Sequence, residues 1–100
     1  MRRLLTMTVM LDEAWSLSPV VALRPEPFGA LAYHFGNRKL TFLKTPALVA
    51  VVTGLAEHAD VRSALTAAGV PETQHEAYAG ALSGLAATDM IRPRSEEAVA

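Results

Sequence analysis

The sequence contains no cysteine, few aromatic residues and no long hydrophobic run. Without cysteine, the chain can form neither a disulfide framework nor a thiolate metal site nor an iron–sulfur cluster. This fits a reducing compartment, so we expect a cytoplasmic protein. The apolar stretch Leu4–Leu11 is far shorter than the ~20 residues of a membrane-spanning helix. Asp12 and Glu13 follow it at once without a small-x-small cleavage site, which argues against a signal peptide.

The sequence also has almost no excess of positive or negative charge. The formal net charge is -1 over 100 residues, with a pI near 6.3. The chain therefore lacks the basic balance typical of proteins that bind nucleic acid or an anionic membrane. Hydrophobic residues nevertheless make up 51% of the sequence, which is enough to give one small domain a core.

Three short apolar runs occupy the first half of the sequence: Val20–Arg24, Ala30–Phe35 and Lys39–Leu43. Proline- and glycine-containing turns separate them, which predicts a three-stranded antiparallel meander. Gly36-Asn37 favours a two-residue type II′ turn, because glycine accepts a positive φ. That turn pairs Tyr33 with Leu40 and Leu31 with Phe42. We expect the face with Leu40 and Phe42 to be buried and Leu43 to point away.

Three helices are predicted in the second half. Thr45-Pro46 is a typical N-cap and first helical position, and apolar residues follow at helical spacing at Leu48, Val51, Val52 and Leu55. Asp60 is expected to cap a second, short helix that ends at Gly69. A third helix starts either at a capping box of Thr73 and Glu76 or at Pro71, and its apolar stripe is Tyr78, Ala81, Leu82 and Leu85.

These elements predict an α+β domain in which a three-stranded antiparallel sheet precedes three helices, like a winged helix with its sheet placed first. We expect the domain to span residues 15–93, with a flexible N-terminal segment over residues 1–14 and a disordered tail over residues 94–100. Trp15, the sole tryptophan, is expected to cover one end of the sheet as part of the core.

DNA binding and catalysis are both disfavoured. A winged helix reads DNA with its third helix, yet no lysine or arginine lies between Arg62 and Arg92 to meet phosphates. His34, His58 and His75 lack metal-ligand spacing, and we expect surface or helix-end positions for them. There is no phosphate loop and no nucleophile elbow. We expect no enzyme activity, no cofactor and no metal.

The third run is predicted to be an open sheet edge, because it contains no proline from Arg38 to Thr45. Two interpretations stand. The flanking Arg38, Lys39 and Lys44 could only protect the edge from aggregation. Alternatively, an extended peptide adds there as a fourth strand and rests on the third helix. Gly80 and Gly84 in that helix suit either close approach of a ligand backbone or tight packing on the first helix.

The motif ALRPEPFGAL-x-YHFG-x-RKL, together with Trp15-Ser16-Leu17 and the later LAEHADVRSALTAAGV, resembles the mycofactocin peptide chaperone family. That family is similar to the precursor-recognition domains of the PqqD type, a winged-helix-like fold. The resemblance covers residues 15–93. It implies a binding protein in the biosynthesis of a ribosomally made, modified peptide (RiPP), not an enzyme.

The resemblance further implies that the chain binds a short precursor peptide and presents it to a radical S-adenosylmethionine (SAM) maturase. That enzyme would decarboxylate the peptide's C-terminal tyrosine oxidatively and cross-link it to the adjacent valine. Relatives hold the peptide as an added strand, so the implied peptide-binding residues here are Lys39, Leu40, Thr41, Phe42, Leu43, Tyr78, Ala81, Leu82 and Leu85. The alternative function is a protein interaction module that binds a partner through its exposed sheet face.

Overall fold

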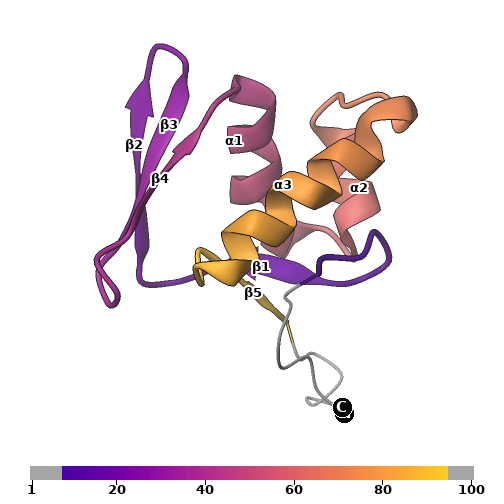
Figure 1. Ribbon diagram of the computed structural model, residues 1–100. Coiled ribbons are helices and arrows are strands. Elements are labelled where there is room, and N and C mark those ends of the chain that lie inside the picture. The colour runs from indigo at the N-terminus through magenta and orange to yellow at the C-terminus, as the bar shows by residue number, and fades with distance from the viewer. Residues whose placement is uncertain (1–7, 95–100) are drawn as a thin grey trace.

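A computed structural model describes residues 8–94; predictions for residues 1–7 and 95–100 lie outside the described residues. The strands are β1 (Trp15–Leu17), β2 (Val21–Glu26), β3 (Gly29–His34), β4 (Leu40–Leu43) and β5 (Ile91–Pro93). The α-helices are α1 (Pro46–Gly54), α2 (Val61–Ala67) and α3 (His75–Ala87), and the 3₁₀ turns are η1 (Leu55–Glu57) and η2 (Glu72–Gln74). The predicted α+β class, with a three-stranded antiparallel sheet β2-β3-β4 and three helices, is confirmed (Figure 1).

The register of the central hairpin is the one predicted, since Tyr33 pairs with Leu40 and Leu31 with Phe42. The type II′ turn is wrong, however. The loop spans four residues, 35–38: the Lys39 carbonyl accepts from the His34 N–H at 3.0 Å, and Arg38, not a glycine, takes the positive φ of 65°. A four-residue loop preserves the register because it adds an even number of residues.

The buried face of the sheet is the opposite of the one predicted. Leu43, Ala30 and Ala32 are almost fully buried, whereas Leu40 and Phe42 are 58% and 59% exposed. The alanines give the reason, because their small side chains let α1 pack closely on that face (Figure 1). The larger side chains are left on the uncovered side.

The helix boundaries follow the predicted local signals. The Thr45 hydroxyl accepts from the Leu48 N–H at 3.0 Å at the start of α1, and the Asp60 carboxylate accepts from the Ser63 N–H at 2.8 Å at the start of α2. Gly69 follows α2 with a φ of 84°. These caps are confirmed.

The capping box of Thr73 and Glu76 is wrong. The chain already turns as η2 directly after Pro71, and the N-cap residue of α3 is Gln74, whose side chain makes no capping hydrogen bond. The alternative start at Pro71 agrees with the structure. His75 is buried there, with Nε2 3.0 Å from the Val70 carbonyl oxygen.

A second small sheet, which we did not predict, joins the two ends of the domain. β1 pairs with β5 in antiparallel fashion, so that Leu17 lies opposite Ile91 and Trp15 opposite Pro93. Trp15 is fully buried, as expected, and its indole N–H donates to Glu13 at 3.0 Å. The chain before β1, residues 8–14, also packs on the domain through the buried Val9.

Candidate functional site

A groove of about 560 Å³ separates the edge strand β4 from helix α3. β4 and the residues after it form one wall, and α3 forms the other. The first turn of α1 also contributes to the lining through Leu48. Most of the exposed lining is apolar. The lining residues are Thr41, Phe42, Lys44, Thr45, Leu48, Ala77, Tyr78, Ala81, Gly84 and Leu85.

The structure brings together part of the predicted peptide-binding set. Thr41 and Phe42 of β4 line the groove with Tyr78, Ala81 and Leu85 of α3. Two other predicted residues, Leu43 and Leu82, are fully buried in the core and so can shape the groove only from beneath. The remaining two, Lys39 and Leu40, are exposed near the hairpin loop and are not part of the lining.

Sequence reasoning missed several residues of the lining. Ala77 lies one helical turn before Ala81, so the 3.6-residue period that gave the stripe could have found it. Leu48 had been assigned wholly to the buried face of α1, but it is half-buried and reaches the groove. Lys44 and Thr45, which connect β4 to α1, carried no such signal.

Gly84 decides between the two interpretations of the α3 glycines. A Cβ added at Gly84 or at Gly80 would meet no atom within 4 Å. Tight packing on α1 therefore does not explain either glycine. Gly84 lines the groove, whereas Gly80 does not, so only Gly84 leaves space that a ligand could fill.

The backbone of β4 presents unpaired polar groups toward the groove side. Hydrogen bonding to β3 alternates along an antiparallel strand. The Lys39 carbonyl bonds to His34 of β3, so Thr41 and Leu43 also face β3, while the N–H and C=O groups of Leu40 and Phe42 point outward. No strand pairs with this edge in the part of the chain that the structure describes. An extended segment could hydrogen-bond there.

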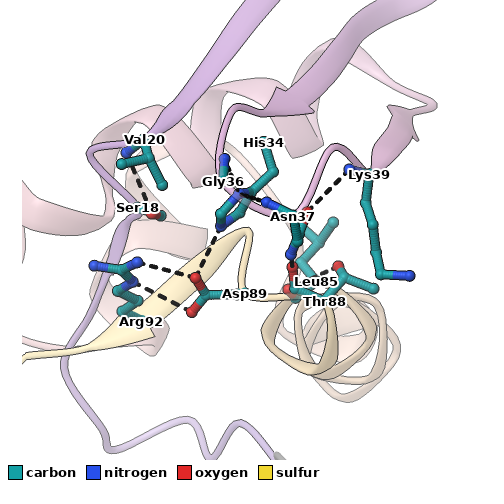
Figure 2. Close-up of polar contacts among 10 residues, drawn as sticks. All are labelled: Ser18, Val20, His34, Gly36, Asn37, Lys39, Leu85, Thr88, Asp89 and Arg92. Carbon is teal, nitrogen blue, oxygen red and sulfur yellow. Dashed lines mark hydrogen bonds and ion pairs between the residues drawn. The ribbon is translucent and has the colours of Figure 1, made fainter.

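Polar contacts fasten the β3–β4 loop to the end of α3 (Figure 2). His34 Nδ1 accepts from the N–H groups of Gly36 and Asn37 at 2.9 and 3.0 Å, so its proton resides on Nε2, which donates to Asp89 at 2.9 Å. The Asn37 amide donates to the Thr88 carbonyl at 3.0 Å. These bonds hold one end of the groove walls together.

Asp89 is the central acceptor of these hydrogen bonds. Arg92 donates to its two carboxylate oxygens at 3.2 and 3.0 Å (Figure 2). The hydrogen bond from Arg92, and after it the one from His34, holds the pKa of the Asp89 carboxyl below its ordinary value. Asp89 is therefore ionised at neutral pH and can accept from both partners.

The surface or helix-end position expected for the histidines is wrong for His34, which is buried at the end of β3. His75 begins α3, as expected, although it is buried there; both side chains are 4% exposed. His34 is buried because its ring completes the loop described above, and His75 because it packs at the start of α3. The described residues contain no group of acidic, histidine or cysteine side chains placed to hold a metal ion. Residues 8–94 also include no helix with the length and apolarity needed to cross a membrane.

Comparison with known proteins identifies the family. Residues 14–92 match the model of the peptide chaperone MftB family. The peptide chaperone MftB of Mycobacterium ulcerans (strain Agy99) is 55% identical over 86% of this chain and 79% of its own length. The proteins of that name from Mycobacterium tuberculosis (strain ATCC 25618 / H37Rv) and Mycolicibacterium smegmatis (strain ATCC 700084 / mc(2)155) are each 54% identical, over 83% and 86% of this chain and 76% and 84% of their own lengths.

No solved structure matches the chain significantly. The relatives are named as chaperones and not as enzymes, which agrees with the predicted non-enzymatic role. The family match runs from β1 into β5 and includes both walls of the groove. The chain therefore belongs to the peptide chaperone MftB family.

Proposed function

We propose that this chaperone binds the mycofactocin precursor peptide as an added β-strand on β4, with its side chains in the groove beside α3. It then presents the peptide to a radical SAM maturase, which decarboxylates the C-terminal tyrosine and cross-links it to the preceding valine. The observation that carries the proposal is the unpaired edge of β4 beside an apolar groove. The family match supports the peptide as ligand.

Backbone pairing alone would not hold the peptide. Leu40 and Phe42 each offer one N–H and one C=O, which makes four hydrogen bonds at a net ~1 kcal/mol each. A micromolar complex requires about 8 kcal/mol, before the cost of ordering the peptide. Apolar side chains of the peptide must therefore fill the groove, and Tyr78, Leu85 and Leu48 are the largest apolar residues on the α1 and α3 walls. We expect strand pairing to set the peptide's direction and the groove to supply most of its affinity.

Gly84→Leu tests this proposal without damaging the fold. The new side chain enters open space in the groove, and glycine in a helix interior costs about 1 kcal/mol, so the variant should be at least as stable as the wild type. We expect titration calorimetry with the precursor peptide to show about a tenfold loss of affinity or more.

Gly80→Leu is the matched control, because Gly80 lies on the same helix with equal open space but outside the groove. It should bind the peptide like the wild type. If folded Gly84→Leu binds the peptide with unchanged affinity, the groove is not the binding site.

A further inference from the structure

No element within residues 8–94 covers the face of the main sheet that points away from α1, and this face is strongly apolar. We name it the outer face; it consists of Leu31, Tyr33, Phe35, Leu40 and Phe42. Phe35 is 62% exposed, and its ring packs edge-on against Tyr33 with centroids 5.0 Å apart. Phe42 packs edge-on against Phe28 at 5.6 Å. Exposed apolar side chains gathered in this way are typical of an interaction surface.

The charge around the outer face indicates the kind of partner. Residues 21–44 contain four cations and one acid, Glu26, a net charge of +3: Arg24, Arg38, Lys39 and Lys44. Arg24 pairs with Leu31, and Lys44 lines a shallow hollow with Phe28 and Phe42, so these two cations border the outer face. In the rest of the described chain, residues 8–20 and 45–94, seven acids outnumber three cations. A surface that fits the outer face therefore has an apolar centre bordered by carboxylates.

A second copy of this chain is a poor occupant. Two outer faces packed on each other about a twofold axis would bring the two cationic rims together. Like charges at such a rim disfavour association. The charge distribution favours a different protein over a homodimer on this face.

The outer face is continuous with the proposed peptide site. Phe42 belongs to both, since it lines the groove and stands exposed on the outer face. Side chains of a strand point alternately to the two faces of a sheet. A peptide paired with β4 would thus place every second side chain beside Leu40 and Phe42 and enlarge the outer face. The loaded chaperone presents a surface that the empty one lacks.

We infer that the outer face is the docking surface for the enzyme that modifies the peptide, and that the bound peptide completes this surface. The inference rests on the proposed function, because it names the partner of the same site. It makes peptide binding and enzyme binding cooperative, each raising the affinity for the other by the same factor. The enzyme's contact surface is apolar and edged by aspartate or glutamate.

The test measures the affinity of the full chain for the maturase by biolayer interferometry, with and without saturating precursor peptide. Phe35→Glu places a carboxylate on the outer face away from β4, and Arg24→Glu reverses a charge of its rim. Each should weaken enzyme binding by about tenfold. Ala56→Glu, which adds the same charge at an exposed position on the helical side, is the control and should bind normally.

Saturating peptide should raise the wild-type affinity for the enzyme. Unchanged enzyme binding by Phe35→Glu and Arg24→Glu would overturn the inference. So would a wild-type dimer in sedimentation velocity that Phe35→Glu dissociates, because a second copy would then occupy the face.

All three variants should keep wild-type peptide affinity in calorimetry. A wild-type chain that binds no peptide refutes the proposed function instead, so the two failures are distinguishable.

Discussion

At the scale of single residues, Asp89 joins two parts of the domain that are far apart in the sequence. It accepts from His34 of β3 and from Arg92 of β5, and the backbone at Asp89 has a positive φ of 64°. Such a conformation is uncommon outside glycine, asparagine and aspartate. The side chain and the backbone of Asp89 thus both suit this position between α3 and β5.

Asp89 gives the domain a defined acid sensitivity. Because the folded state lowers the pKa of this carboxyl below its ordinary 3.8, its stabilising effect is fully present above that value. The effect is lost as the pH falls through the still lower folded pKa. We expect Asp89→Asn to flatten the pH dependence of the free energy of unfolding at acidic pH, measured by urea denaturation from pH 6 downward.

Asp60 provides the comparison for that experiment. Hydrogen bonds from Ser63 lower its pKa in the same direction, so it also contributes to acid sensitivity. Asp60→Asn should flatten part of the curve while leaving the contribution of Asp89 intact. An acid profile that Asp89→Asn leaves unchanged would show that this carboxylate contributes no proton-linked stability.

At the scale of elements, the two edges of β4 differ: one pairs with β3 and the other faces the groove. The N–H groups of Thr41 and Leu43 face β3, whereas those of Leu40 and Phe42 face the groove side. Proline lacks the N–H, so its effect depends on the position it replaces. Proline substitutions at two adjacent positions of β4 therefore test strand addition.

Phe42→Pro should abolish strong peptide binding and leave most of the stability, because no residue in the described part of the chain pairs with the N–H that it removes. Thr41→Pro should destabilise the domain, because it removes a bond to β3. Circular dichroism melting and peptide calorimetry on both variants make the comparison, with Phe42→Ala correcting for the lost ring. Equal peptide affinity in Phe42→Pro and Phe42→Ala would contradict strand addition.

The elements also show where sequence reasoning succeeds. Thr45, Asp60 and Gly69 act within a few residues of themselves, so their caps and stop could be predicted from local chemistry. The register of β3 and β4 followed from the spacing of apolar residues around a short loop. The loop type did not, because it depends on the contact between His34 and Asp89, 55 residues apart.

Prediction of the candidate site from the sequence was limited in a similar way. The edge strand and the α3 stripe could be predicted as walls, since each has its own periodicity. Which side chains enter the groove depends on which sheet face α1 covers, and alternation alone cannot decide this when both faces are partly apolar. Leu43 was expected to point away from the core for this reason, and Leu40 to be buried.

At the scale of the whole molecule, the corrected orientation of the sheet determines what is core and what is available for binding. Leu43 is 1% exposed, whereas Leu40 on the opposite face is 58% exposed. Leu43→Ala should lower the free energy of unfolding by about 2–5 kcal/mol, because it leaves a cavity. Leu40→Ala should change it by only about 0.5 kcal/mol. Chemical denaturation of this pair measures the difference, and equal losses would reject the assigned orientation.

The pairing of β1 with β5 brings residue 15 beside residue 93, so the first and last strands of the described chain lie together. Figure 1 shows this small sheet below the helices, apart from the hairpin at the far end of β2 and β3. A tether attached next to β5 would thus extend from the small sheet, away from the β2–β3 turn.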